Sequence, residues 1–281
     1  MDVKRSMQEE FPRRAGAARQ PLMAVSALAC VLMLAACSNT PKDETVGWTP
    51  EKLYSEAKDE MDAGNFERAG VLFERLEGRA TGTLLSQQAQ LERAYVMYRS
   101  NEKSQALSIL ERFIKLHPTS PALDYALYLQ GLVNFNDNLG ILGNLAQQDL
   151  SERDQQASRD AYQSFRQLVE RFPQSSYAPD AQLRMNYIVN ALASYEVHVA
   201  RYYYRRGAYV AAANRAQITV QDFRQTPAIE EALYLMASSY EKLGLVELQA
   251  DATRVLKQNF PNSKFISGGL GKRESAWWQF W

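Results

Sequence analysis

Cysteine is nearly absent from this sequence, which has two in 281 residues, Cys30 and Cys37. Both precede the residues that we expect to fold. The folded part therefore has no thiol that could form a disulfide, act as a nucleophile or bind a metal ion. This excludes disulfide-stabilised folds, cysteine enzymes and cysteine-ligated metal sites.

Histidine is equally scarce, and His117 and His198 are the two in the chain. His117 precedes a proline, and His198 lies in a predicted helix with no Cys, His or paired carboxylate at metal-ligand spacing. The chain also lacks a glycine-rich phosphate loop, a G-x-S-x-G elbow and an H-E-x-x-H motif. We therefore expect both histidines to be structural or exposed, with no metal site and no catalytic residue. The alternative is that the protein is an enzyme. A catalytic activity that is lost when one polar residue is replaced would support this alternative.

Net charge is also absent, because 32 basic and 32 acidic residues cancel. Affinity for nucleic acids rests largely on neutralising their phosphates. A nearly neutral chain is a poor binder of such polyanions, so we expect no nucleic-acid partner.

The uncharged run near the N-terminus, residues 22–36, is fifteen residues long. A helix needs about 20 apolar residues to span a bilayer. The length instead fits the apolar core of a secretory signal peptide, and Arg13, Arg14 and Arg19 supply the positive charge that precedes such a core. We predict that residues 1–36 are a signal peptide.

The run ends in "LAAC", residues 34–37, which resembles the bacterial lipobox. On this reading Cys37 becomes the first mature residue and carries a diacylglycerol and an N-acyl chain, since a single acyl chain anchors only reversibly. Ser38, in place of Asp, implies the outer membrane in lipoproteins of this type. Apart from this covalent lipid we expect no cofactor. The alternative is a plain signal peptide cleaved after a small-x-small site, with Cys37 incidental.

The remaining chain divides into a short polar segment and a long helical one. Residues 37–49 are polar, with Pro41 and Gly47, and are typical of a tether. From residue 50 onward apolar residues recur three and four apart, and Ala, Leu, Glu, Gln and Arg are frequent, which favours helix. We predict a helical body over residues 50–262.

Spacing within this body indicates tetratricopeptide (TPR) repeats. Pro227 and Pro261 lie 34 residues apart, which is the TPR period, and the pattern G-x-[FY]-x-x-A begins at Gly64 and again at Gly207. Glycine permits a tight turn between paired helices, alanine permits their close approach, and proline ends the second helix. We predict an all-α fold, an α-solenoid of about five TPR-like helix pairs, at residues 50–82, 87–120, 121–175, 177–227 and 228–262.

Two stretches depart from the ideal repeat. Residues 134–155 read as an insertion that forms a loop or short helix, and residues 180–206 read as one first helix nearly twice the usual length.

The stretch "RYYYRRGAYVAAANR", residues 201–215, contains four tyrosines and four arginines. Tyr209 occupies the aromatic turn position of a repeat, so we expect it in the core. Tyr202, Tyr203 and Tyr204 lie about 100° apart on a helix, so at least one faces solvent. The stretch reads as core tyrosines beside a solvated basic helix end, or as a protein-binding patch, since Tyr and Arg are favoured interface anchors. A single-stranded nucleic-acid groove has similar composition, but it conflicts with the neutral charge and the secreted location.

Four segments carry a resemblance to a known family: "LHPTSPALDYALYLQGLVNF", "FPQSSYAPDAQLRM", "VHVARYYYRRGAYVAAANRA" and "LGLVEL" (residues 116–135, 172–185, 197–216 and 243–248). With the lipobox and the five-repeat layout, they make the chain closely similar to the BamD (ComL) family of TPR lipoproteins of the β-barrel assembly (BAM) machinery. The resemblance covers essentially all of the expected mature chain, and residues 197–216 are its most specific part.

The resemblance implies a lipoprotein on the periplasmic face of the outer membrane that helps to insert β-barrel proteins. In this family the C-terminal repeats dock on the POTRA region of the barrel subunit BamA and on accessory lipoproteins. The N-terminal repeats are thought to receive unfolded barrel substrates. Asn214 and Arg215 match the partner-contacting segment of the family, and Arg201, Arg205 and Arg206 are weaker neighbours.

The placement of aromatic residues in the first three repeats predicts a substrate groove lined by Tyr54, Tyr95, Tyr98, Tyr125 and Tyr128. Packing in the core is the alternative for each of these tyrosines. The alternative for the whole protein is an envelope or peptidoglycan-associated TPR scaffold.

Residues 263–281 are predicted to be a flexible tail that ends in "WWQFW", a motif that matches no feature of the family. Its aromatic residues could cover a groove on the last repeat, contact the membrane interface, or mimic the aromatic C-terminal signal of a barrel substrate.

Overall fold

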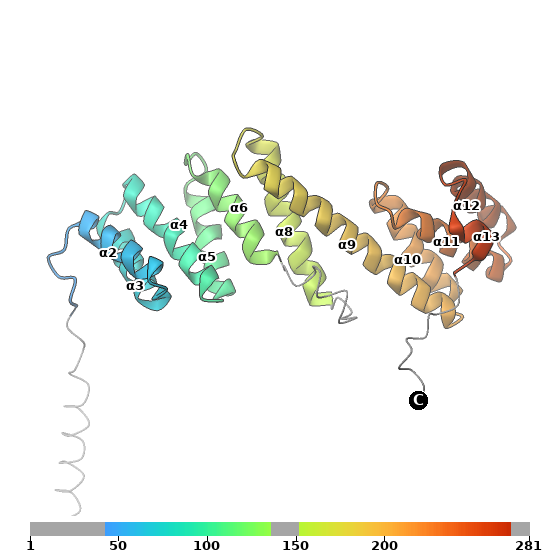
Figure 1. Cartoon of the computed structure of the whole chain (residues 1–281), viewed down its shortest axis with the longest axis horizontal. Helices are drawn as coiled ribbons and strands as arrows, with labels where there is room; N and C mark the ends of the chain where they lie inside the picture. Colours follow the sequence, from blue (N-terminus) through green and yellow to red (C-terminus); the bar gives the residue numbers. More distant parts are fainter. Residues whose placement is uncertain (1–42, 136–151, 271–281) are drawn as a thin grey trace, which may run out of the picture. The chain divides into compact units, whose positions relative to one another are not determined.

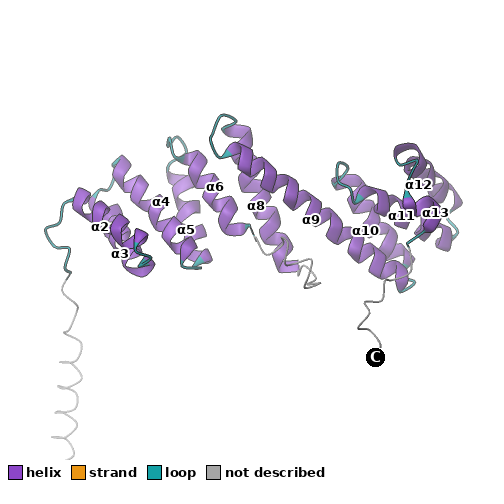
Figure 2. Ribbon diagram, viewed as in Figure 1, coloured by secondary structure: helices purple, strands orange, loops and turns teal. Residues whose placement is uncertain are grey.

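The computed structural model describes residues 43–135 and 152–270, and every regular element in these ranges is a helix (Figures 1 and 2). The predicted signal peptide, Cys37, most of the predicted insertion and the WWQFW motif lie outside the described residues. The chain divides into two units, Met1–Trp48 and Thr49–Trp281. No helix in the described ranges combines the length and apolar character needed to cross a membrane.

The described part of the first unit, residues 43–48, forms turns. The hydroxyl and the backbone N–H of Thr45 both donate to Oδ1 of Asp43, at 2.7 Å and 2.9 Å. This short stretch of the predicted tether is therefore held by local hydrogen bonds.

The second unit is a succession of helix pairs, in which each helix packs against the next along the chain. The first helices of the five pairs are α2 (Pro50–Asp62), α4 (Leu84–Arg99), α6 (Leu123–Asn134), α9 (Ala178–Arg205) and α11 (Ile229–Leu243). The second helices are α3 (Phe66–Arg79), α5 (Lys103–Leu116), α8 (Glu152–Arg171), α10 (Tyr209–Asp222) and α12 (Val246–Asn259). The predicted all-α solenoid of TPR-like pairs is confirmed.

The helices begin and end at residues that favour a helix terminus. Thr49 caps α2 by accepting a hydrogen bond from the N–H of Lys52, and Pro50 begins the helix, where its missing N–H costs nothing. Gly64 and Gly207, between the helices of the first and fourth pairs, have φ of 83° and 78°, which L-residues with a side chain rarely adopt.

A small and an aromatic residue on the second helix form the seam of the first and third pairs. Ala69 and Phe73 on α3 are completely buried, and so are Ala161 and Phe165 on α8. Because residues four apart lie on the same helix face, the alanine lets the backbones approach while the ring fills the space beside it.

Helix α9 has 28 residues, whereas the other first helices have 12 to 16. Its first half contributes Met185, Ile188 and Leu192 to a core shared with α6 and α8. Its second half contributes Val197 and Ala200 to a core shared with α10 and α11. The prediction of one long first helix is confirmed.

Two boundaries differ from the sequence expectation. Residues 152–155, placed in the insertion, are the first turn of α8. Within the predicted flexible tail, α13 (Lys264–Gly268) is a short helix whose Phe265 is buried and stacks on Tyr234 of α11 at 5.5 Å between ring centroids. A single buried aromatic residue gives no periodic signal, which explains why the sequence did not reveal this helix.

Replacing Gly131 with alanine should destabilise the fold. Gly131 lies on α6, where an added Cβ would overlap the ring of Phe165, with Cδ1 at 2.6 Å. We expect a loss of about 1–3 kcal/mol in the free energy of unfolding, measured by urea denaturation. The matched control is Gly78→Ala on α3, where a Cβ meets nothing within 4 Å. It should gain about 0.5–1 kcal/mol, and equal stability of the two variants would contradict the packing described.

Candidate functional site

Arg215, on α10, forms an ion pair with a buried carboxylate of α9. Its Nη1 lies 3.1 Å from Oε2 of Glu196, whose side chain is 4% exposed, whereas that of Arg215 is 40% exposed. The hydrogen bond to Glu196 outweighs partial burial and raises the pKa of the Arg215 guanidinium. The positive charge is therefore fixed in position, and part of the guanidinium remains open to solvent.

The close approach of α9 and α10 brings this pair together. Ala212 and Ala216 of α10 are fully buried, so the backbones of the two helices lie near each other. Asn214 is exposed next to Arg215. The two residues predicted to contact a partner thus present an amide and a held cation on one surface, which suits an acidic or polar acceptor.

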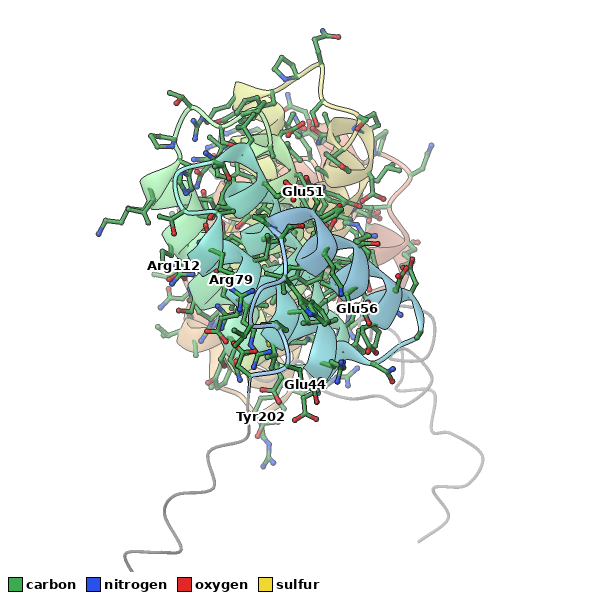
Figure 3. The ribbon with its side chains drawn as sticks, turned by 90° about the vertical axis from the view of Figure 1, so that its left-hand side faces the viewer. Glu44, Glu51, Glu56, Arg79, Arg112 and Tyr202 are labelled. Carbon is green, nitrogen blue, oxygen red and sulfur yellow. The ribbon has the colours of Figure 1, made fainter. Side chains whose placement is uncertain are left out.

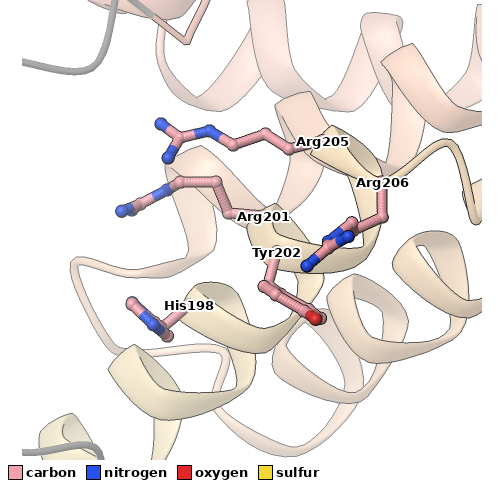
Figure 4. A pocket seen from close by; sticks show the side chains of 5 residues that line it. All are labelled: His198, Arg201, Tyr202, Arg205 and Arg206. Atoms are coloured by element: carbon pink, nitrogen blue, oxygen red, sulfur yellow. The ribbon is translucent and has the colours of Figure 1, made fainter. Parts of the chain in front are cut away.

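Arg201, Arg205 and Arg206 lie around an open hollow at the C-terminal end of α9, of roughly 520 Å³ (Figure 4). Arg201 is held by Glu231 of α11 through two hydrogen bonds, of 2.6 Å and 2.7 Å. The guanidinium of Arg206 stacks over the ring of Tyr202 at 5.4 Å. Tyr202 is 53% exposed and projects from the surface (Figure 3), which confirms that at least one tyrosine of this run faces solvent.

The five predicted partner-binding residues do not form one surface. Glu196 and Arg205 are nine residues apart on α9, which turns about 100° per residue, so they point in roughly opposite directions. Arg215 therefore lies on the side of α9 opposite Arg205, and it does not line the hollow that Arg201, Arg205 and Arg206 surround.

Tyr125 and Tyr128 of α6 meet Tyr177 at the start of α9, with ring centroids 5.5 Å and 4.8 Å away. Burial raises the pKa of the Tyr125 hydroxyl, and the nearby Glu92 and tyrosines, Tyr95 among them, raise it further. These rings from α4, α6 and the start of α9 form the tyrosine cluster, defined as Tyr95, Tyr125, Tyr128 and Tyr177.

The cluster is tied to α9 by a polar contact. The Tyr128 hydroxyl donates to Oδ2 of Asp180 at 2.8 Å, and Nε of Arg184 donates to the same oxygen at 2.6 Å. Burial by itself would raise the pKa of Asp180, but the hydrogen bonds from Arg184 and Tyr128 outweigh it and lower that pKa.

The other two predicted groove residues lie outside the cluster. The hydroxyl of Tyr54 accepts a hydrogen bond from Nε2 of Gln88 at 2.6 Å, and its ring packs edge-on against Phe73. Tyr98 packs against the core between α4, α5 and α6. All five predicted tyrosines are half-buried, which fits an amphipathic surface as well as the margin of a core.

Sequence reasoning missed Glu196, Tyr177, Asp180 and Arg184. The last three lie within "FPQSSYAPDAQLRM", one of the segments that carry the family resemblance, so that segment was an available signal. His117 packs against Phe113, with ring centroids 5.0 Å apart. In the described ranges no group of three or more His, Cys, Asp or Glu residues could hold a metal ion.

Replacing Arg215 with methionine should destabilise the protein because it leaves the Glu196 carboxylate buried without its partner. We expect a loss of about 1–3 kcal/mol in the free energy of unfolding, measured by urea denaturation. The double variant Arg215→Met with Glu196→Gln should recover most of this loss, since no buried charge remains. A double variant as unstable as the single one would show that packing, and not the charge, governs the site.

Replacing Tyr128 with phenylalanine should reduce stability in a pH-dependent way. The folded pKa of Asp180 is lowered, so its stabilising contribution is present above its unfolded pKa of about 3.9 and is lost as pH falls through the lower folded value. Because the phenylalanine removes one donor to Asp180, the variant should be less stable than wild type at pH 6 and approach it below pH ~3. Tyr98→Phe is the control, and urea denaturation across pH should show no such convergence for it.

Comparison with known proteins places the chain in a family. The family model described as "YfiO: Outer membrane lipoprotein" matches residues 47–256. The "Outer membrane protein assembly factor BamD" of Neisseria meningitidis serogroup A is 47% identical over 255 residues, covering 89% of this chain and 96% of the relative. Proteins of the same name from Neisseria gonorrhoeae and Xylella fastidiosa are 46% and 35% identical, over 89% and 88% of this chain and 96% and 84% of their own lengths.

Among solved structures, TPR-like repeats of a kinesin light chain from Podosopora anserina cover 76% of this chain and 96% of their own at 15% identity, with a TM-score of 0.33, too low to compare the two folds. The family model and the relatives, by contrast, span most of the sequence, and the relatives align over nearly their whole lengths. This chain belongs to the BamD (YfiO) family of outer membrane lipoproteins.

Proposed function

We propose that this chain is an outer-membrane protein assembly factor, a non-catalytic scaffold anchored by lipid on Cys37 to the periplasmic face of the outer membrane. The observation that carries the proposal is the 47% identity, over nearly the whole of both chains, to proteins named as BamD assembly factors. The succession of helix pairs supports it, because such arrays present extended binding surfaces.

The scaffold would act by holding its partners close together. A lipid anchor confines the chain to the membrane surface, and separate binding surfaces on one solenoid raise the effective concentration of one partner near another. No bond is made or broken in such a role.

The surface with Asn214 and Arg215 is the proposed docking site for the POTRA region of a BamA-like barrel subunit. Its support is the ion pair with Glu196, which holds the cation in position before binding and so lowers the entropy cost of recognising an acidic residue. The hollow with Arg205 and Arg206, which Arg215 does not line, is the proposed contact for accessory BAM lipoproteins.

The tyrosine cluster, with Tyr54 and Tyr98 on the neighbouring helices, is the proposed contact for unfolded β-barrel substrates. Its half-buried rings offer apolar faces and its hydroxyls offer hydrogen bonds, which matches an unpaired strand with alternating apolar and polar residues. Covering such a strand would prevent edge-to-edge aggregation until it pairs in a barrel.

Affinity purification from detergent-solubilised outer membranes tests the docking site. Changing Arg215 alone would leave the buried Glu196 carboxylate without its ion-pair partner. The informative variant is therefore the double change Glu196→Gln and Arg215→Gln. The expected result is that a large β-barrel protein with periplasmic repeats co-purifies with wild type and is at least tenfold depleted with the variant.

The matched control is Asp251→Asn with Arg254→Gln, which removes another ion pair, of 2.9 Å, on α12. Equal recovery with wild type and both variants would keep the assembly role but reject Arg215 as its docking residue. Failure to recover any barrel protein, together with retention of the chain on murein sacculi, would instead favour a peptidoglycan-associated scaffold.

A further inference from the structure

Helices α8 and α10 both pack on α9 (Figure 1). A groove, called the second groove, is lined by residues of α8, the first half of α9 and the end of α10 with the turn that follows it. It has a volume of about 1160 Å³, larger than most small-molecule sites. Its walls are one face of α8, the first half of α9, and residues 221–226, which comprise the last two residues of α10 and the start of the turn to α11. Asn214 and Arg215 do not line it, and neither do the residues of the tyrosine cluster.

The groove has an apolar floor and a polar rim, as peptide-binding sites do. Met185, Leu192 and Phe223 are each less than 10% exposed and form the floor. The rim consists of exposed side chains, most of them amides or arginines: Arg159, Gln163 and Arg166 on α8, Gln182, Asn186 and Asn190 on α9, and Gln221, Arg224 and Gln225 at the end of α10 and on the turn.

The amides on α9 are spaced to pair with an extended backbone. Gln182, Asn186 and Asn190 follow one another at intervals of four residues, about 6 Å apart along the helix. In an extended chain the backbone groups that point to the same side repeat every two residues, at about 6.6 Å. Gln182 Nε2 donates to Oδ1 of Asn186 at 3.2 Å, and Nδ2 of Asn190 donates to the backbone carbonyl of Asn186 at 2.9 Å. Each of the three amides keeps a further N–H and an acceptor lone pair, which can bond alternate peptide groups of a ligand of any sequence.

The positive charge of the rim favours an acidic ligand. Three arginines and one acidic residue, Asp222, line the groove. In the described part of the chain Arg159 has no carboxylate within ion-pair distance, and the pair of Arg166 with Glu170 is long, at 3.6 Å, and exposed. The two arginines lie on one face of α8, seven residues and about 10 Å apart. Side chains on one face of an extended chain repeat every two residues, so carboxylates four residues apart, about 13 Å, lie within reach of two long arginine side chains.

We propose that this groove binds an extended acidic segment of a partner protein, with the α9 amides bonding its backbone and Arg159 and Arg166 pairing with carboxylates four residues apart. The site is additional to the docking surface around Arg215. It rests on the geometry of the groove and does not require the assembly function.

Fluorescence anisotropy with the purified full chain in detergent tests the site. The probe is a labelled twelve-residue peptide of serine, threonine and valine, with glutamates at every fourth position. The variant Arg159→Glu with Arg166→Glu should weaken binding at least tenfold. Lys103→Glu with Lys257→Glu, which makes the same change in net charge at exposed positions away from the groove, should bind like wild type.

Backbone pairing is tested separately. Asn186→Ala with Asn190→Ala should weaken binding at least fivefold without loss of stability, since alanine is the better helix former. Methylating alternate backbone nitrogens of the peptide should weaken binding to wild type to a similar extent. Undiminished affinity for the methylated peptide, or in either groove variant, would overturn the proposal.

Sedimentation equilibrium of the same proteins tests whether a second copy of this chain occupies the groove instead. Wild type should be monomeric at the micromolar concentrations of the binding assay. Self-association of wild type that is abolished by Arg159→Glu with Arg166→Glu would show that the groove joins two copies of this chain, which also overturns the proposal.

Discussion

The two halves of α9 belong to different cores, and much of the second unit depends on that shared helix. A short amphipathic helix cannot bury its apolar face alone, so each pair of this protein is stable only against its neighbours. Helix α9 contacts α8 through its first half and α10 and α11 through its second. A single rigid element thus fixes the third, fourth and fifth pairs with respect to their common helix.

This arrangement also explains why the candidate sites gather around α9. Tyr177 and Asp180 lie at its start, the amides of the second groove follow in its first half, and Glu196 holds Arg215 in its second half. Each site uses a different face or level of the helix. The proposed substrate and partner surfaces can therefore be occupied together without direct overlap, as the proposed scaffold role requires.

The repeats could be predicted from sequence because their signals are local. The turn glycines, the prolines after second helices, and pairs such as Ala69 and Phe73 each act within one helix or turn. The long α9 was recognisable for the same reason, since no breaking residue interrupts it. The start of α8 and the packed α13 were missed because a polar first turn and one buried phenylalanine carry no periodic pattern.

The sites were less accessible to sequence reasoning, because they depend on which residues meet across helices. Glu196 looks like a surface acid until the register of α10 places Arg215 beside it. The predicted group of arginines divided into two surfaces for a related reason, since neighbours in sequence can point to opposite sides of one helix. The second groove combines residues from three separate segments of the chain, and none of these segments has a distinctive sequence by itself.

The short helix α13 has a consequence for how this array can change in length. Phe265 stacks on Tyr234, and Leu270 packs against the core of the last pairs, so these residues occupy surface where a further helix pair would have to dock. Helix α12 carries exposed charges, such as Arg254 and Lys257, together with exposed Val246 and Leu248. Since neighbouring first helices of the array also contact each other, as α9 and α11 do, a further helix pair at this end would have to displace α13 from α11.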